Sequence, residues 1–194
     1  KSFTKMSKVK ILMVGPCEVG KSTISNILAD IAEGPSESYR PTKGCRIVEF
    51  EKDAPLAVKK QFAGKIYVEL WDCSGDLEYE KCWPAIQKGA QGIVFVYNPK
   101  NPNSEKDMEF FINNFAKSAK ILPKQCMAYA HHFDVGEYGP SSKPLHCFKG
   151  LSVVDCTAEN SSTIVPSFDK YFGHLMNILS DVAEKEENRI MDEI

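Results

Sequence analysis

The sequence reads Gly15-Pro16-Cys17-Glu18-Val19-Gly20-Lys21-Ser22 near its beginning, a stretch that fits the pattern G-x-x-x-x-G-K-[ST]. It follows the apolar run 11–14 and precedes a segment that starts at Thr23 and in which apolar residues recur at helical spacing from Ile24 onward. That order of strand, glycine-rich loop and helix is what a phosphate-binding loop requires. We call residues 15–22 the phosphate loop. Together with Thr23, its backbone N–H groups are expected to surround the α and β phosphates of a nucleotide, with Lys21 bridging β and γ and Ser22 binding Mg²⁺.

Length and composition limit the number of domains, the partners and the compartment that the chain can have. The chain has 194 residues, 43% of them hydrophobic, which is enough for one well-buried soluble domain. We find no stretch that is long and apolar enough to cross a membrane. The net charge of -2 predicts no broad basic surface, so we expect neither nucleic acid nor an anionic lipid surface as a partner. Seven cysteines without a C-x-x-C pair argue against a disulfide scaffold or a zinc site and favour a reducing, cytoplasmic compartment.

Strand-like runs alternate with helical segments, which predicts an α/β fold whose mostly parallel sheet has helices on both faces. The six expected strands are 9–14, 46–50, 66–71, 92–97, 125–130 and 151–154, the second and third forming a hairpin-like pair at one edge. Ser104 and Asp107 predict a capping box at the start of a helix, and 168–182 predicts the last helix. The Gly-, Pro- and Ser-rich stretch 135–150 predicts a loop, not a helix, between the last two strands.

The ends of the chain carry separate expectations. We expect the domain to span residues 7–183 and a charged tail, 184–194, to fray. Residues 1–5 precede Met6 and are expected to be an addition to the native chain. The last four residues contain no C-a-a-X cysteine, so we expect no direct lipid anchor.

A second motif, Asp72-Cys73-Ser74-Gly75, follows the third expected strand. It would supply an acidic group near Mg²⁺ and, from Gly75, an N–H that can reach the γ-phosphate. Between the two motifs lies Thr42, whose hydroxyl and carbonyl could reach the metal and the triphosphate. Thr42 is therefore a candidate metal ligand and γ-phosphate sensor, although the same segment also fits an ordinary surface turn before a strand.

With these motifs the chain resembles the Ras-like small GTPases over nearly its whole length, including Cys156-Thr157-Ala158 near a position that contacts guanine. Rarer strings narrow the resemblance to the Rab-like subunits of the intraflagellar transport machinery; they are 15–18, 41–47, 71–76, 82–85 and 130–132. The resemblance implies a G domain of the P-loop NTPase class that binds GTP or GDP with Mg²⁺. It also implies coiled-coil subunits of intraflagellar transport complex B as partners, and a location in the cilium or flagellum and in the cytoplasm near the basal body.

The base-reading motif departs from the usual Asn-Lys-x-Asp of that family and reads His131-His132-Phe133-Asp134. Asp134 can still accept hydrogen bonds from the ring N–H and exocyclic amine of guanine, while the missing Lys weakens the clamp. His131, His132, Thr157 and Ala158 are the other residues expected near the base. A plainer interpretation is that the two histidines only cap the strand; a His-His metal site lacks the carboxylate or cysteine that would complete it.

Two further departures concern hydrolysis. Cys17 stands where a glycine ordinarily leaves room for the attacking water, and Asp76 stands where active relatives carry the glutamine that positions that water. A carboxylate cannot donate to the transition-state oxygens and is repelled by the triphosphate. With Asp76 and Thr42 as the residues at the reacting phosphate, we predict a GTP-holding adaptor with slow hydrolysis.

Two alternatives remain open. In the first, Asp76 orients water as a weak base or Arg40 supplies an arginine in cis, and the chain is a cycling GTPase stimulated by an activating protein. In the second, the chain is a P-loop kinase for a small substrate. That class needs an arginine-bearing lid, and the stretch 135–150 contains no arginine.

Overall fold

The computed structural model describes residues 6–32, 40–58, 62–133, 145–158 and 161–192. Its centre is a six-stranded sheet with the order β2-β3-β1-β4-β5-β6. Neighbouring strands are parallel except for β2 and β3, which pair antiparallel at one edge of the sheet. The predicted α/β class and edge hairpin are therefore confirmed. The strands are β1 (Met6–Val14), β2 (Cys45–Asp53), β3 (Phe62–Cys73), β4 (Gly92–Tyr97), β5 (Cys126–His132) and β6 (Ser152–Thr157).

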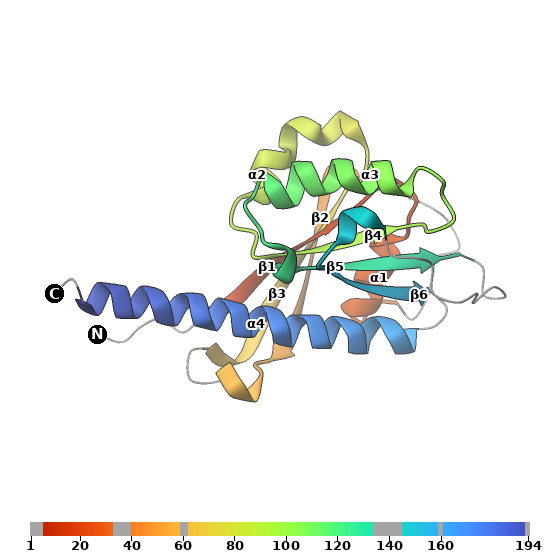
Figure 1. The fold of residues 1–194 in the computed structure, drawn as a ribbon. Helices are drawn as coiled ribbons and strands as arrows, with labels where there is room; N and C mark the ends of the chain where they lie inside the picture. Colours follow the sequence, from red (N-terminus) through yellow and green to blue (C-terminus); the bar gives the residue numbers. More distant parts are fainter. Residues whose placement is uncertain (1–5, 33–39, 59–61, 134–144, 159–160, 193–194) are drawn as a thin grey trace.

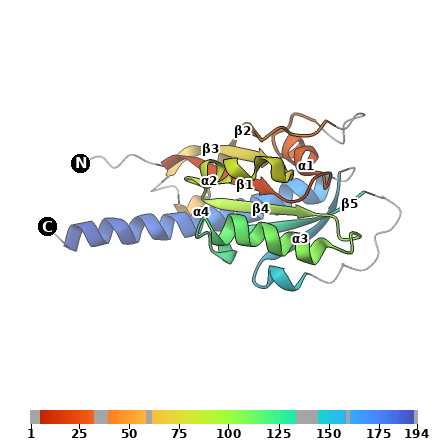
Figure 2. The same ribbon diagram turned by 90° about the horizontal axis from the view of Figure 1, so that it is seen from above.

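Helices cover both faces of the sheet. In Figures 1 and 2, α1 (Lys21–Leu28) and α4 (Ser161–Asp192) lie on one face, and α2 (Trp83–Gln87) and α3 (Ser104–Phe111) lie on the other. A π-helical turn, Ile112–Lys117, continues α3. Short 3₁₀ helices occupy Leu56–Val58, Leu77–Cys82, Pro123–Gln125 and His146–Phe148.

Two hydrophobic cores result from this layering. One joins α1 and α4 to the sheet and includes Ile24, Phe168 and Leu175. The other joins α2 and α3 to the opposite face, where the Trp83 and Phe115 rings lie 4.8 Å apart. All six residues of β4 are buried, because a strand in the middle of a parallel sheet is covered on both sides. The cores support the sheet from both faces, and the parallel strands β1, β3, β4, β5 and β6 all end on the side of the sheet where β2 begins.

Two local expectations need correction, and a third lies mostly outside the described residues. The capping box at Ser104 does not form, because Ser104 is already the first helical residue and its hydroxyl donates to the Asn98 carbonyl at 2.6 Å. The expected frayed tail is helical as far as Asp192, with an ion pair between Arg189 and Glu186 at 2.7 Å. Most of the loop predicted between β5 and β6 falls in 134–144, outside the described residues, and the remainder contains the 3₁₀ turn His146–Phe148.

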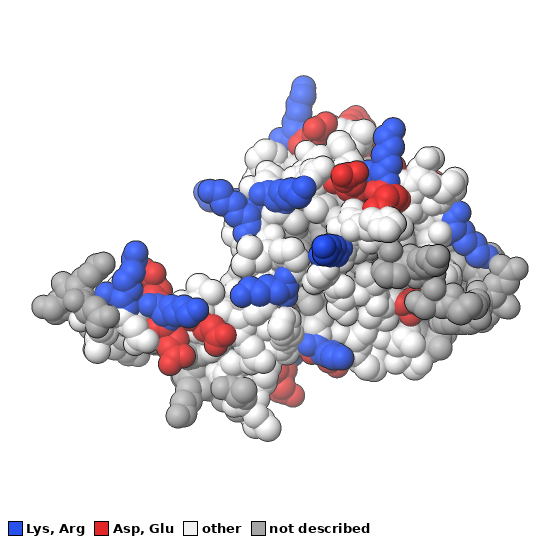
Figure 3. Space-filling view, in the orientation of Figure 1, with Lys and Arg blue, Asp and Glu red and all other residues white. Residues whose placement is uncertain are grey.

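The surface agrees with the modest net charge. On the face drawn in Figure 3, charged side chains of both signs are scattered over a largely uncharged surface, and the protruding end of α4 carries both signs of charge. Among the described residues, every helix falls short of the length or the apolar character that spanning a bilayer demands.

Candidate nucleotide site

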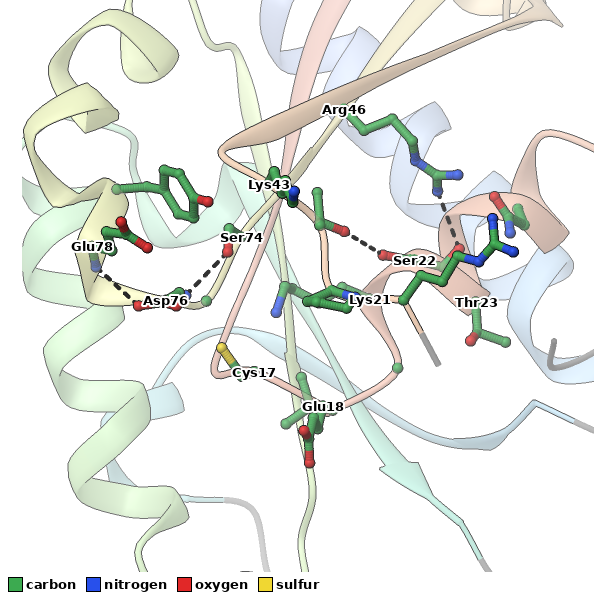
Figure 4. Close-up of a pocket in the computed structure, with 18 of the residues that line it drawn as sticks. Cys17, Glu18, Lys21, Ser22, Thr23, Lys43, Arg46, Ser74, Asp76 and Glu78 are labelled. Carbon is green, nitrogen blue, oxygen red and sulfur yellow. Dashed lines mark hydrogen bonds between the residues drawn. The ribbon is translucent and has the colours of Figure 1, made fainter. Parts of the chain in front are cut away.

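The candidate site is an open cavity of about 1130 Å³ at the sheet edge where β1 and β3 end (Figure 4). Pockets that hold small ligands have volumes of roughly 300–1,000 Å³, so a nucleotide triphosphate fits this space. Three segments that are far apart in the sequence supply most of the wall: 17–23, 40–43 and 74–76. The structure thus brings the two sequence motifs and Thr42 together.

Lys21 lies inside the phosphate loop with only 6% of its surface exposed. Its ammonium donates to the carbonyls of Gly15 and Pro16, at 2.8 and 2.5 Å. Burial lowers the pKa of Lys21, and the nearby Asp72 carboxylate acts in the opposite direction. The cation is therefore held at the centre of a loop whose N–H groups can receive phosphate oxygens.

Three oxygen-bearing side chains meet beside Lys21. The hydroxyls of Ser22 and Thr42 are 3.0 Å apart, although they belong to separate segments. Asp72 is fully buried, and its Oδ1 atom has no hydrogen-bond partner among the described residues. Burial raises the pKa of Asp72, although the neighbouring Ser22 and Arg46 side chains act in the opposite direction.

These oxygens fit Mg²⁺. An octahedral Mg²⁺ with bonds of about 2.0–2.1 Å places adjacent ligands about 2.9 Å apart, close to the 3.0 Å between the Ser22 and Thr42 oxygens. The unpartnered Asp72 oxygen adds an acceptor of the hard type that Mg²⁺ prefers. The donor set is accordingly that of a magnesium-assisted phosphate site.

Arg46 was missed by the sequence analysis. It faces Asp72 across the antiparallel β2–β3 pair and donates to the Asp72 carboxylate at 3.2 Å and to the Ser22 carbonyl at 3.4 Å. Figure 4 shows its guanidinium reaching toward the start of α1. The predicted hairpin was the available signal, but it did not fix which residues face each other.

Gly75 packs directly against the phosphate loop. A Cβ at this position would lie 2.3 Å from the Pro16 carbonyl carbon and 2.4 Å from the Cys17 nitrogen. Backbone atoms cannot yield as a flexible side chain can, so only glycine permits this approach. The close contact brings Gly75, the end of the second motif, to the phosphate loop, where the Gly75 N–H was expected to reach the γ-phosphate.

Asp76 lines the cavity, but its carboxylate caps its own chain. Oδ1 accepts a hydrogen bond from the Glu78 N–H at 3.0 Å, which makes Asp76 the N-cap of the 3₁₀ helix Leu77–Cys82. Its own N–H donates to the Ser74 hydroxyl at 3.2 Å. Cys17 also lines the cavity and is exposed.

His131 fixes the phosphate loop from behind. Its ring is 2% exposed, and Nδ1 lies 3.0 Å from the Val19 carbonyl. Because a carbonyl only accepts, Nδ1 must carry the hydrogen, and burial lowers the pKa of His131, which favours the neutral form of the ring. A Cβ on Gly20, where φ is 91°, would come within 2.4 Å of this ring.

The other base-site residues are arranged differently from the expectation. His132 pairs with Asp155 of β6 at 2.9 Å, so the two histidine side chains have different hydrogen-bond partners. Thr157 and Ala158 are buried, and neither they nor the two histidines are among the residues that line the cavity. Asp134 lies outside the described residues. Phe133, unassigned by the motif, lines the cavity, is 52% exposed, and meets the His131 ring edge to face at 4.7 Å.

Comparison with known proteins finds relatives that match nearly the whole chain. A family model for the Ras of Complex (Roc) domain of DAPkinase matches residues 10–134. Intraflagellar transport protein 22 homologs from Danio rerio and Homo sapiens are each 37% identical to this chain, covering 96% of it and 100% of the relative. The chain belongs to the intraflagellar transport protein 22 family.

Solved structures of this family share the fold. The GTP-bound T. brucei IFT22/74/81 crystal structure matches with a TM-score of 0.70 and 26% identity, over 91% of this chain and 98% of that one. The GDP-bound T. brucei IFT22 structure matches with a TM-score of 0.64 and 27% identity, over 88% and 97%. The Ras-like G-domain fold expected from the sequence is confirmed.

Proposed function

We propose that this chain is a guanine-nucleotide-binding subunit of the intraflagellar transport machinery. In this proposal Mg²⁺·GTP orders the segments that carry Thr42 and Gly75, and the ordered surface binds partner subunits. The main support is the 3.0 Å contact between the Ser22 and Thr42 hydroxyls beside the buried, half-partnered Asp72 carboxylate. The family members solved with GTP, with GDP and with IFT74/81 agree with it.

Each group in the cavity has a role in this proposal. Lys21 leaves the Gly15 and Pro16 carbonyls and binds the β and γ phosphates, and the N–H of Gly75 binds the γ-phosphate. Ser22 and Thr42 hold Mg²⁺, with Asp72 accepting nearby, and the metal would neutralise charge on the phosphate oxygens. Asp134 would accept from guanine, and Phe133 would cover the base.

Hydrolysis is proposed to be slow. The carboxylate of Asp76 is occupied as an N-cap and carries no hydrogen to donate to the developing charge. Cys17 narrows the space on the γ-phosphate side. The bound GTP would therefore persist long enough to act as a structural ligand of the subunit rather than as a substrate that is turned over.

One observation favours a cycling enzyme as a second candidate. Arg40 is exposed and lines the same cavity, where a guanidinium could stabilise transition-state charge in cis. An Arg40→Ala substitution that slows single-turnover hydrolysis many-fold, with unchanged GTP affinity, would favour this candidate. The adaptor proposal expects little change in that rate.

The decisive experiment compares the wild-type chain with Ser22→Asn in pull-downs from flagellar extract. The substitution removes a proposed Mg²⁺ ligand, so less guanine nucleotide and fewer transport-complex subunits should be recovered. Ser118→Asn, at an exposed position away from the cavity, is the matched control. Adenine nucleotide in the mass spectrum of the bound fraction would reject guanine specificity.

Recovery of partner subunits tests separately whether bound nucleotide controls assembly. Equal recovery of coiled-coil complex B subunits by the nucleotide-depleted variant would show that nucleotide state does not control assembly. A fluorescent fusion that stays out of the flagellum and basal-body region, and remains evenly cytoplasmic, would contradict the transport role itself.

A further inference from the structure

Two cysteines face each other beside the proposed nucleotide cavity. Cys45 begins β2 and Cys73 ends β3, and the two are direct partners in the antiparallel register. Their sulfur atoms are 4.0 Å apart, and both thiols are free. The function proposed above uses neither thiol.

The register gives this pair the geometry that a disulfide needs. The adjacent residues Gly44 and Ser74 form the hydrogen-bonded pair, with the Ser74 N–H donating to the Gly44 carbonyl at 2.8 Å. Cys45 and Cys73 are thus a non-hydrogen-bonded pair, in which Cα atoms lie about 4.5 Å apart and side chains approach most closely. Disulfides span Cα distances of about 4.4–6.8 Å, so side-chain rotation can join these sulfurs without moving the strands.

The two thiols differ in accessibility. Cys45 is half-buried, whereas Cys73 is 1% exposed. A small reagent in solution can therefore reach Cys45 first, and Cys73 is positioned behind it as the second thiol. This is the arrangement of an attacking and a resolving cysteine.

We propose that Cys45 and Cys73 form a reversible regulatory disulfide by exchange with a low-molecular-weight disulfide such as oxidised glutathione. The Cys45 thiolate attacks one glutathione sulfur, releasing a first glutathione thiolate and leaving a mixed disulfide. The Cys73 thiol then loses its proton and attacks the Cys45 sulfur, releasing the second glutathione. Two electrons and two protons pass from the cysteines to the two glutathione thiols, and a reduced thiol pool reverses the step.

The disulfide would covalently link the two points at which the segments 40–44 and 74–76 join β2 and β3. Cys45 lies three residues after Thr42, and Cys73 lies between Asp72 and Ser74. With the hairpin end closed covalently, the segments 40–44 and 74–76 cannot separate at their roots, so nucleotide release slows. This consequence rests on the proposed function; the disulfide itself does not.

The test treats the full-length protein with oxidised glutathione and counts the thiols that remain open to alkylation. We expect wild type to lose two thiols and to yield a linked pair of tryptic peptides, 44–46 with 66–81, without glutathione mass. Cys45→Val and Cys45→Ser should form no such link, the first variant keeping a strand-favouring residue. Cys147→Ser, at a similarly half-buried but remote thiol, should form it normally.

Several results would overturn the proposal. They are a stable glutathione adduct on Cys45 with Cys73 still a free, alkylatable thiol, a disulfide between other cysteines, or the same thiol loss in Cys45→Val. Release of a fluorescent guanine nucleotide should be slower from the oxidised protein, recover with dithiothreitol, and be unaffected by oxidant in Cys45→Val. A linked peptide without slower release would overturn the regulatory step, whereas a protein without nucleotide would overturn only the proposed function.

Discussion

Phe133 is an aromatic side chain that lines the nucleotide cavity and to which the motif pattern assigns no role. It stands where the usual motif has a variable residue, while His132, at the lysine position, is engaged with Asp155. Stacking of a base on an aromatic ring contributes about 1–3 kcal/mol. We therefore predict that Phe133→Ala lowers guanine nucleotide affinity about 5- to 150-fold, measured by calorimetric titration.

Two controls make this prediction specific. Phe133→Tyr keeps the ring face and should keep the affinity. Phe110→Ala removes another partly exposed ring, one that does not line this cavity, and should leave binding unchanged. Equal affinity of wild type and Phe133→Ala would mean that the base lies elsewhere.

Asp76 combines a local structural role with a proposed brake on hydrolysis. Asp76→Gln restores an amide that can donate, so single-turnover GTP hydrolysis should become faster. Because glutamine also removes the N-cap to Glu78, Asp76→Asn is the informative companion: asparagine caps well but carries no charge. If wild type hydrolyses GTP as fast as Asp76→Gln, the carboxylate is not a brake.

At the scale of elements, the contact between the β3 end and the phosphate loop depends on Gly75. An alanine Cβ would meet backbone atoms at 2.3–2.5 Å, and overpacking of this kind costs about 1–3 kcal/mol. Gly75→Ala should force the two segments apart and weaken GTP binding more than GDP binding, because only GTP carries the γ-phosphate. Parallel titrations with the two nucleotides measure the difference.

Gly64→Ala is the matched control, in β3, the strand that precedes Gly75. Its Cβ would have no neighbour within 4 Å. This variant should bind both nucleotides as wild type does. Equal losses for GTP and GDP in Gly75→Ala would contradict a specific role at the γ-phosphate.

Element types were predictable because their signals are local. Alternating apolar runs located all six strands, and the order of strand, glycine loop and helix located Lys21 and Ser22. Contacts that depend on register were not predictable: a hairpin pattern does not say that Arg46 faces Asp72. The capping prediction failed because the helix begins at Ser104 itself, whose hydroxyl donates to the carbonyl of Asn98 in the turn just before the helix, a pairing outside the capping-box pattern.

The candidate site was predicted better at its phosphate end than at its base end. Phosphate binding uses backbone groups and a fixed spacing, which the sequence displays directly. Base recognition uses side chains from separate loops, and the substitution of two histidines changes their partners. His131 contacts Val19 of the phosphate loop and His132 contacts Asp155 of β6, pairings that form only in the folded chain.

At the scale of the whole molecule, His131 makes stability depend on pH. Burial lowers its pKa below the ordinary 6.5, so the unfolded chain binds a proton more readily than the folded one. The contribution of the neutral His131 ring to the free energy of unfolding is complete above about pH 6.5. It is lost as the pH falls toward the lower pKa that His131 has in the folded chain. Urea unfolding from about pH 8 to about pH 5 should therefore show a declining free energy of unfolding.

His131→Asn isolates this contribution. Asparagine can still donate to the Val19 carbonyl but does not titrate in this range, and the remaining histidines are common to both proteins. The difference between the two stability curves should narrow as the pH falls below 6.5, the ordinary pKa of His131. A constant difference would show that His131 titrates equally in the folded and unfolded chains.

The order of strands also governs biosynthesis. β1 leaves the ribosome before both of its neighbours in the sheet, β3 and β4, which begin at residues 62 and 92. Such distant parallel pairings are slow to form, and unpaired apolar strands invite association with other chains. The apolar side chains of β1 therefore stay without both neighbouring strands until β4, which ends at Tyr97, has been translated, and the phosphate loop that follows β1 gains its full support from the sheet only then.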